Sequence, residues 1–365
     1  MYTRGMSIAI YRKYRPQTLA DIIGQESVTG VLASALKQDK IAHAYLLYGP
    51  RGTGKTTIAR IVAKAINCQN QKNGEPCNIC PHCLAIQNNQ ALDVIEIDAA
   101  SNRGIDEIRN LQELTKTLPA IFRYKVLIID EVHMLTPQAF NALLKTLEEP
   151  PAHAVFILAT TEYEKLPATI ISRTQRYHFR RLTLQEIATK LKKICEAEKI
   201  TFEPEALELI AHAADGGVRD AESLLDQISS MKGSVSTGHV EQVLGKVDFK
   251  KTSHMSGLII EKNLENALEF LHEIHTGGHN VFQFNKDITE YLRRVLSLKL
   301  NPKLEELFSR DIAHSELQEI KQHALKADPE FLIKVIKSLI QAYTYMRYNP
   351  FPIAPFEIAL IENLK

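Results

Sequence analysis

The chain has 365 residues, of which 45% are hydrophobic and 24% are charged. These fractions are ordinary for a globular protein and exclude a disordered or fibrous chain. At roughly 150 residues per domain, the length predicts two or three domains. The formal charge of +1 gives no indication of nucleic acid or of an acidic partner. Residues 1–65 differ, since ten basic and three acidic side chains give them a local charge of +7.

The sequence contains no run of about 18 apolar residues that could cross a bilayer. Its first residues have neither the apolar run nor the cleavage site of a signal peptide. We therefore expect a cytoplasmic protein, in which disulfide bonds are rare. The five cysteines are then candidates for metal ligands, catalytic groups or ordinary core residues.

Five short apolar runs of strand length lie in the first half of the chain, and helical patterns separate most of them. The runs cover residues 44–49, 94–98, 125–130, 154–160 and 176–179. Strands that alternate with helices predict a mainly parallel α/β sheet covered on both faces. One helix is predicted in detail: Thr136 is its N-cap, Pro137 its first residue, and Pro150 and Pro151 end it.

Beyond about residue 180 the pattern is helical, and no further strand is expected. Helical patterns at roughly 183–198, 204–214 and 218–231 precede a Gly- and Ser-rich break and a short fourth helix. Longer helical patterns fill the remainder. We therefore predict an α/β domain over residues 1–181, a small helical domain over 182–246 and a second helical domain over 247–365.

Residues 49–56 read GPRGTGKT and match the phosphate-loop pattern G-x-x-x-x-G-K-[ST] between a predicted strand and a predicted helix. Glycines let backbone N–H groups and the helix N-terminus face a phosphate. Lys55 would reach the β- and γ-phosphates, and the Thr56 hydroxyl would ligate Mg²⁺. An ordinary glycine turn is the alternative, which the flanking strand and helix disfavour. The predicted nucleotide-binding residues are Gly49, Pro50, Arg51, Gly52, Thr53, Gly54, Lys55, Thr56 and Thr57.

The apolar run 125–130 ends in two acids that can complete such a site. Asp130 would hold Mg²⁺ through water, and Glu131 would polarise the attacking water. Thr160 and Thr161 end another run at the same sheet edge, where a hydroxyl could orient that water. Acids after a strand are often only solvated loop residues, so this prediction depends on the phosphate loop.

Four cysteines lie between the phosphate-loop helix and the next strand, in the order C-x8-C-x2-C-x2-C: Cys68, Cys77, Cys80 and Cys83. Four thiolates at this spacing favour a closed tetrahedral Zn²⁺ site. An iron–sulfur cluster is the alternative. His82 could replace one thiolate, but we interpret it as a bystander and Cys195 as a core residue. The segment between residues 67 and 90 has ten Asn and Gln, so a metal would fold a loop too polar to fold itself.

Two arginines have ambiguous surroundings in the sequence. Arg173 follows a short helix predicted at 164–171, and by itself it would be an ordinary surface residue. Arg219 could equally pair with Asp215 or Asp220 close by in the chain.

A resemblance adds to this interpretation. The segments YRKYRPQTLADIIGQE, HAYLLYGPRGTGKTTIAR, the four cysteines, IEIDAASNRGIDEIR, KVLIIDEVHMLTPQAFNALLKTLEEPP, LPATIISR and GGVRDAESLLDQ occur in this order. They resemble the bacterial DNA polymerase III gamma/tau subunits, the AAA+ ATPases of the clamp loader. The resemblance covers residues 11–246 and continues more weakly beyond. It implies an AAA+ P-loop domain with a five-stranded parallel sheet, a helical lid domain and an all-helical collar domain for oligomerisation.

The resemblance also implies a role for single residues. The two nucleotide motifs become Walker A and Walker B, and the four cysteines become zinc ligands. Thr161, or less readily Thr160, corresponds to sensor 1. Arg219 corresponds to sensor 2 on the γ-phosphate of its own subunit, and Arg173 to an arginine finger on the ATP of a neighbour. Relatives contact DNA from the helix after AASxxx, where Arg109 fits.

The implied function is ATP-driven loading of a sliding clamp onto primed DNA, within a DNA polymerase holoenzyme. ATP, Mg²⁺ and Zn²⁺ are the implied cofactors. Delta- and delta-prime-like subunits, the sliding clamp, primer–template DNA and further copies of the chain are the implied partners. The chain ends soon after the expected collar, as a short gamma-like form or a truncated tau would. Two alternatives remain: another AAA+ DNA motor, of branch-migration or helicase-loading type, and a clamp-loader scaffold subunit without hydrolysis.

Overall fold

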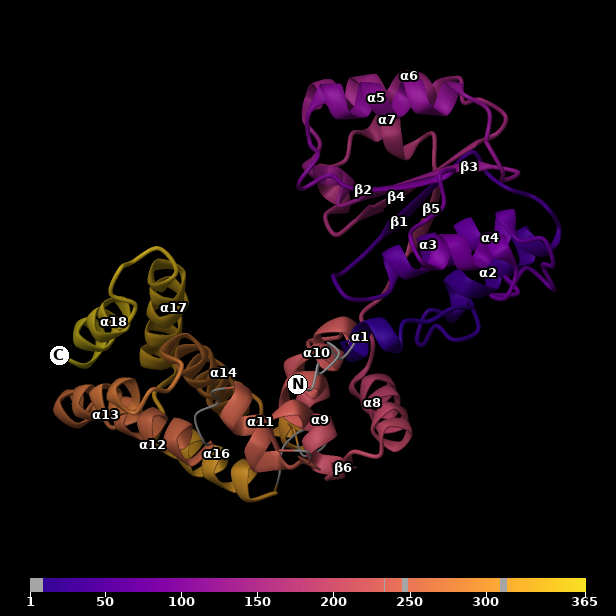
Figure 1. Ribbon diagram of the computed structural model, residues 1–365. Coiled ribbons are helices and arrows are strands. Elements are labelled where there is room, and N and C mark those ends of the chain that lie inside the picture. Colours follow the sequence, from indigo (N-terminus) through magenta and orange to yellow (C-terminus); the bar gives the residue numbers. More distant parts are fainter. Residues whose placement is uncertain (1–8, 233, 245–248, 309–313) are drawn as a thin grey trace, which may run out of the picture. The chain divides into compact units, whose positions relative to one another are not determined.

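The computed structural model describes residues 9–232, 234–244, 249–308 and 314–365 (Figure 1). These residues form two compact units, Met1–Thr237 and Gly238–Lys365. The boundary predicted between residues 246 and 247 lies outside the described residues. Within them, none of the helices combines the length and the apolar character needed to cross a membrane.

The first unit is built on a five-stranded sheet in the order β2-β3-β4-β1-β5, in which every neighbouring pair is parallel. Its strands are β1 (Ala44–Tyr48), β2 (Val94–Asp98), β3 (Lys125–Asp130), β4 (Ala154–Thr160) and β5 (Gln175–His178). The predicted α/β class and the five predicted runs are confirmed. Because all strands run the same way, the carboxyl ends of β1, β3 and β4 meet at one edge.

Helices cover both faces of this sheet (Figure 1). On β3, Val126 and Ile128 pack in the core with α2 (Glu26–Lys37) and α3 (Lys55–Asn67), whereas Leu127 and Ile129 pack in the opposite core. That second core includes α5 (Ile105–Lys116), α6 (Pro137–Glu148) and α7 (Ala168–Ile171). The short helix α4 (Pro81–Gln87) lies beside α3. Burial on both faces explains why these strands are apolar throughout rather than alternating.

The caps of α6 follow the prediction, with Thr136 accepting a hydrogen bond from the Ala139 N–H and Pro137 at the first position. The helix predicted at 164–171 is wrong as a single element. It is divided into a 3₁₀ turn, η2 (Tyr163–Lys165), and α7, because Pro167 has no N–H for a helix interior and stands instead at the N-cap of α7.

A helical lid completes the first unit. It contains α8 (Leu184–Glu198), α9 (Pro204–Ala213) and α10 (Val218–Lys232), near the three predicted spans, and α1 (Ile10–Lys13) contacts α10. A capping box formed by Thr183 and Glu186 starts α8. The expectation of no further strand is wrong, since β6 (Thr201–Phe202) pairs in parallel with β7 (Ser234–Val235). Two residues are too few to show a strand period.

The second unit is helical in its described residues, as predicted. Its elements are α11 (Thr237–Leu244), which begins at the unit boundary, α12 (Phe249–Ile260), α13 (Leu264–Thr276), α14 (Val281–Leu300), η3 (Pro302–Leu304), α15 (Glu305–Phe308), α16 (His314–Lys326), α17 (Pro329–Met346) and α18 (Ala354–Leu364). Its core centres on fully buried side chains such as Phe284, Leu292 and Phe356.

Candidate functional site

A cleft in the first unit gathers most of the predicted nucleotide residues. It lies at the phosphate loop between β1 and α3, and residues of the N-terminal segment, the end of β3 and the lid complete it. Its lining is Tyr11, Arg15, Pro16, Asp21, Ile22, Ile23, Arg51, Gly52, Thr53, Gly54, Lys55, Thr56, Thr57, Asp130, Glu131, Lys190, Val218, Arg219 and Glu222.

The phosphate loop has a backbone that only glycine adopts readily at three positions, Gly49, Gly52 and Gly54, of which the first and last are decisive. Gly49 has φ +145°, and a Cβ there would stand 2.2 Å from the Phe179 carbonyl oxygen. Gly54, with φ +101°, is the N-cap of α3 and lets the chain turn directly into the helix. The N-terminal N–H groups of α3 therefore open into the cleft, which is a ready site for an anion.

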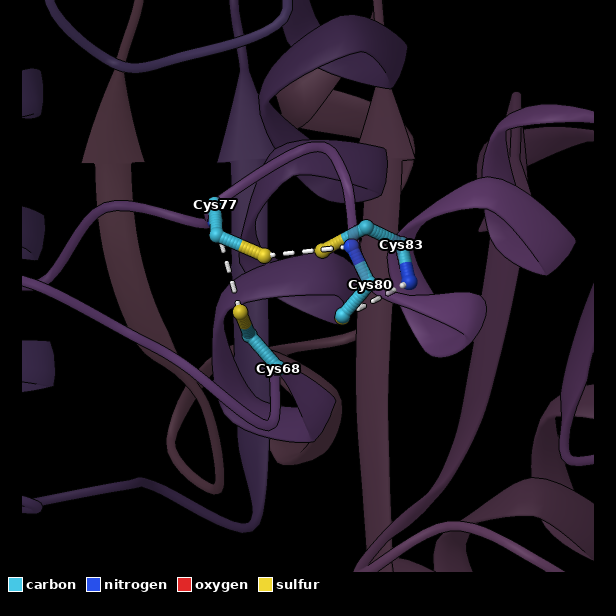
Figure 2. Close-up of side chains that lie close together, drawn as sticks. All are labelled: Cys68, Cys77, Cys80 and Cys83. Atoms are coloured by element: carbon cyan, nitrogen blue, oxygen red, sulfur yellow. Dashed lines mark hydrogen bonds between the residues drawn. The ribbon is translucent and has the colours of Figure 1, made fainter.

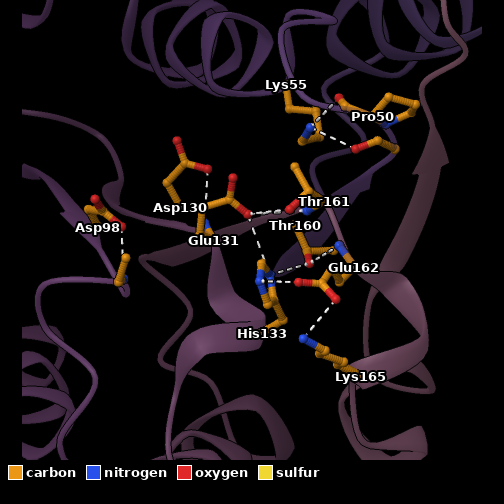
Figure 3. A network of polar contacts seen from close by, with 12 residues as sticks. Pro50, Lys55, Asp98, Asp130, Glu131, His133, Thr160, Thr161, Glu162 and Lys165 are labelled. Atoms are coloured by element: carbon orange, nitrogen blue, oxygen red, sulfur yellow. Dashed lines mark hydrogen bonds and ion pairs between the residues drawn. The ribbon is translucent and has the colours of Figure 1, made fainter. Parts of the chain in front are cut away.

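Lys55 is 6% exposed and is held inside this loop. Its Nζ donates hydrogen bonds to the carbonyl oxygens of Gly49 at 2.8 Å and Pro50 at 2.7 Å (Figure 3). Burial lowers the pKa of Lys55, while the charges of Glu131 and Asp130 act in the opposite direction. An ammonium group thus stands at the loop with carbonyl partners that phosphate oxygens can replace.

The two predicted magnesium ligands touch each other. The Thr56 hydroxyl donates to Asp130 Oδ2 at 2.6 Å, and Asp130 Oδ1 accepts from the Glu131 N–H at 2.9 Å. A hydroxyl and a carboxylate oxygen at the first turn of α3 are hard oxygen ligands of the kind that Mg²⁺ prefers. The donor set therefore fits a magnesium ion bound with the phosphates.

Glu131 has an unusual backbone and a fixed side chain. Its φ of +47° is in the left-handed region, which is strained for a non-glycine residue. Its Oε2 accepts hydrogen bonds from the Thr161 hydroxyl at 2.8 Å and from the Thr161 N–H at 3.3 Å (Figure 3). Of the two threonines considered for sensor 1, Thr161 thus contacts the predicted catalytic base.

His133 is a member of this network that the sequence analysis missed. Its Nδ1 lies 3.0 Å from the Thr160 hydroxyl and 3.4 Å from Glu131 Oε2, and its Nε2 lies 3.2 Å from Glu162 Oε1 (Figure 3). The side chain is 5% exposed. The sequence signal that could have placed His133 in the site is its position three residues after Asp130. The 3₁₀ turn η1 (Val132–Met134) there turns the side chain back toward β4.

The lid supplies two further groups to the cleft. Arg219 lies over the ring of Tyr11, with its Cζ 5.1 Å from the ring centroid. Asp215, one of its predicted alternative partners, pairs with Arg181 instead. Glu222 was missed, although it lies three residues after Arg219 on the same face of α10.

Glu222 is 5% exposed, and burial raises its pKa to about 7 against the opposing charges of Lys190 and Arg15. Its Oε1 has no hydrogen-bond partner among the described residues.

Arg173 and Arg109 do not line the cleft. Arg173 donates to Glu148 Oε1 at 2.7 Å and to the Thr169 carbonyl oxygen at 3.0 Å. Arg109 is exposed on α5, where it forms an ion pair with Asp106 at 3.5 Å. Neither contact assigns a partner outside the chain.

The four predicted cysteines come together, with their Sγ atoms within 4.8 Å of one another (Figure 2). Cys80 and Cys83 are buried, and Cys80 is also the N-cap of α4. The Ile79 N–H lowers the pKa of Cys77 to about 6, which favours the thiolate. Sulfurs on a tetrahedral zinc ion stand about 3.8 Å apart, given a Zn–S distance of about 2.3 Å. The cluster therefore fits one metal ion after a small contraction.

Two contacts join the cysteine segment to the N-terminal segment of the chain. The Glu75 carboxylate accepts hydrogen bonds from the N–H groups of Leu19 at 2.8 Å and Ala20 at 3.0 Å. Lys64 of α3 donates to the Gln17 carbonyl oxygen at 3.1 Å and to Asn78 Oδ1 at 2.6 Å.

His82 is engaged elsewhere, with its Nδ1 2.8 Å from the Asn67 carbonyl oxygen. Cys195 is buried in α8, as a core residue would be.

A phosphate loop, an acidic strand end beside it, a parallel sheet and a helical lid define an AAA+ P-loop ATPase fold. Comparison with known proteins narrows this class. A family model for the DNA polymerase III delta subunit matches residues 24–183, one for the ATPase lid domain of the DNA polymerase III clamp loader subunit matches 186–231, and one for domain III of DNA polymerase III subunits gamma and tau matches 235–364.

The chain is 45% identical to DNA polymerase III subunit tau of Bacillus subtilis over 97% of its own length. It is 36% identical to DNA polymerase III subunit gamma of Buchnera aphidicola, over 83% of each chain. The chain belongs to the gamma and tau subunit family of DNA polymerase III. It spans 62% of the length of the Bacillus relative. A solved structure of the Thermotoga maritima RuvB branch migration motor aligns with 73% of this chain and 86% of its own, at 22% identity and a TM-score of 0.48.

Proposed function

We propose that this chain is an ATP-hydrolysing motor subunit of a bacterial clamp loader, which loads a sliding clamp onto primed DNA. One observation carries the proposal: Lys55, the Thr56–Asp130 pair and Glu131 border one cleft in a chain of the gamma and tau family, and Glu131 accepts a hydrogen bond from Thr161 beside it. Intact phosphate, metal and base residues favour hydrolysis over a scaffold role.

Binding of the triphosphate uses the loop and helix α3. The N–H groups at the start of α3 face the phosphates, and the Lys55 ammonium exchanges the Gly49 and Pro50 carbonyl oxygens for β- and γ-phosphate oxygens. Thr56 and Asp130 hold Mg²⁺, which neutralises charge on the phosphates when bound. The remaining lining residues of loop and helix, including Arg51 and Thr57, surround the phosphates.

Hydrolysis needs a polarised water and compensation of the charge that develops on the γ-phosphate. Glu131 accepts a hydrogen bond from the water, and Thr161 orients Glu131 and the water. Arg219 approaches the γ-phosphate from the lid of the same subunit. Arg173 acts on the ATP of an adjacent subunit.

We also propose that the cysteine cluster holds one structural Zn²⁺. The support is chemical, since four soft thiolates with no open position match zinc. A metal there folds a polar segment and takes no part in hydrolysis.

Membership of the family supports further proposals about the binding partners of the chain and its location in the cell. We propose that the chain assembles with delta- and delta-prime-like subunits and further copies of itself, and acts on a sliding clamp and primer–template DNA in the cytoplasm. Arg109, exposed on α5, is the proposed DNA contact. We retain the division into an AAA+ domain (1–181), a lid domain (182–246) and a collar domain (247–365).

The test is ATP turnover by the chain in complex with its companion subunits, with the clamp and the primed DNA each omitted in turn. We expect turnover to rise when both are present. A branched DNA junction that stimulates turnover without any clamp would support a branch-migration motor instead. A chain that binds no nucleotide would support a scaffold.

A further inference from the structure

The cleft has a part at the phosphate loop and a part formed by the N-terminal segment and the lid. Lys55, Asp130 and Glu131 supply the charges for the phosphates and the metal. Outside the phosphate loop and the end of β3, the lining combines apolar and charged side chains. The apolar ones are Pro16, Ile22, Ile23 and Val218, the charged ones are Arg15, Asp21, Lys190, Arg219 and Glu222, and Tyr11 lines this part as well. A nucleoside triphosphate anchored at the phosphate loop therefore has its nucleoside against these remaining walls.

Glu222 has an oxygen that the protein leaves without a hydrogen bond. The residue is 5% exposed, and its Oε1 is buried without a partner among the described residues. A buried acceptor without a partner is destabilising, and in native proteins it calls for a missing water, ion or ligand. Because Glu222 also lines the cleft, a ligand in the cleft can supply the missing donor.

The other acids of the cleft have partners. Asp130 accepts from Thr56, Glu131 accepts from Thr161, and Asp21 accepts from the Thr18 hydroxyl at 2.7 Å. Burial raises the pKa of Glu222 to about 7, as expected for a carboxyl that has lost water without full compensation. Both the neutral and the ionised carboxyl retain an acceptor oxygen.

We propose that Glu222 selects the base of the nucleotide, by accepting a hydrogen bond from the exocyclic 6-amino group of adenine. A 6-oxo purine presents an acceptor at that position, so it leaves the ionised carboxylate unpaired. The apolar residues stabilise any purine ring by contact, and Glu222 adds the discrimination. This inference rests on the proposed function, because it requires a nucleoside triphosphate in the cleft.

The test compares Mg²⁺-ATP with Mg²⁺-purine riboside 5′-triphosphate, which lacks only the amino group, by calorimetric titration of the full 365-residue chain. We expect the wild-type chain to prefer ATP by about 10- to 100-fold, the usual effect of a hydrogen bond to a buried charged or polar group. Glu222→Leu should lose this preference. Glu222→Gln should keep most of it, since its amide oxygen still accepts. Glu208→Leu, an exposed site on α9 outside the cleft, should match wild type.

The outcomes separate the two proposals. If the wild-type chain binds both triphosphates equally, or if Glu222→Leu keeps the preference, Glu222 does not read the base although the proposed function stands. If the wild-type chain binds neither, the proposed function fails and the inference fails with it. Thermal unfolding of each variant without nucleotide shows that it is folded, and Leu removes an unpaired buried oxygen, so no loss of stability is expected.

Discussion

Replacement of Arg173 by alanine tests whether the proposed active site is shared between subunits. Phosphoryl transfer places negative charge on the γ-phosphate oxygens, and a guanidinium supplies permanently charged, planar donors to them. Arg173 does not line the cleft of its own chain. Arg173→Ala should therefore leave the ATP affinity of the isolated chain nearly unchanged. It should remove the turnover that clamp and DNA stimulate in the assembled complex.

The structure allows the size of the effect to be compared with the cost of moving the side chain. Arg173 is paired with Glu148 at 2.7 Å, and the two side chains are 33% and 50% exposed. A pair this exposed contributes about 0.2–1 kcal/mol. An arginine finger contributes about 10³–10⁵ in rate, or about 4–7 kcal/mol. Release from Glu148 is therefore a minor cost, and loss of the finger should be visible even against a slow basal rate.

The assay measures stimulated ATP turnover in complexes that mix Arg173→Ala chains with Lys55→Ala chains. If Arg173 acts in trans, some interfaces pair a wild-type Lys55 with a wild-type Arg173, and partial activity returns. Arg123→Ala is the matched control, because Arg123 is also a surface arginine in an ion pair, with Asp39 at 2.8 Å, and lies outside the cleft. Collapse of ATP binding in the isolated Arg173→Ala chain would refute the reasoning and make Arg173 a local structural residue.

Three further results are expected. Metal analysis should find one zinc per wild-type chain and much less zinc in the Cys80→Ser chain. Iron in place of zinc, or a zinc content of the Cys80→Ser chain equal to that of the wild type, would contradict the assignment. Lys55→Ala should weaken ATP binding in a calorimetric titration. Glu131→Gln should bind ATP but hydrolyse it slowly, and hydrolysis by Glu131→Gln at the wild-type rate would exclude Glu131 as the base.

The raised pKa of Glu222 means that the folded state holds this proton more tightly, so its contribution to stability is complete below pH 4.5 and is lost as the pH rises through about 7. At 1.36 kcal/mol per pKa unit this contribution amounts to about 3 kcal/mol. Urea unfolding of the wild-type chain at pH 4.5 and pH 8 should show this difference in the free energy of unfolding, whereas the Glu222→Gln chain should lack it. Identical pH dependence of the two chains would exclude the burial effect.

The predictable parts of this fold are those with a strong local pattern. Val126–Ile129 are apolar at every position because both faces of β3 are buried, and such a run ending in acids is recognisable without a structure. The glycine spacing of the phosphate loop reflects backbone requirements at Gly49 and Gly54, so it too is visible in the sequence. The cysteine spacing likewise predicts that the four sulfurs meet.

The parts that could not be predicted depend on contacts between distant segments. Thr160 and Thr161 are adjacent and chemically alike, and only the turn at Glu131 decides which hydroxyl it meets. In the sequence Glu222 has the pattern of a solvent-exposed helix residue. It is buried only because α10 packs against the N-terminal segment, a contact between distant parts of the chain. Pro167 was the available signal against a continuous helix at 164–171, and it was overlooked.

The bond from Glu75 to the chain at Leu19 and Ala20 has a thermodynamic consequence. Leu19 and Ala20 are held by the cysteine segment, and the next residues, Asp21, Ile22 and Ile23, line the cleft. A metal that orders the cysteine segment therefore orders a wall of the cleft as well. Linkage is reciprocal, so any factor by which metal raises nucleotide affinity is the factor by which nucleotide raises metal affinity. Shortening the insertion would leave two backbone N–H groups without an acceptor and would alter the cleft from a distance.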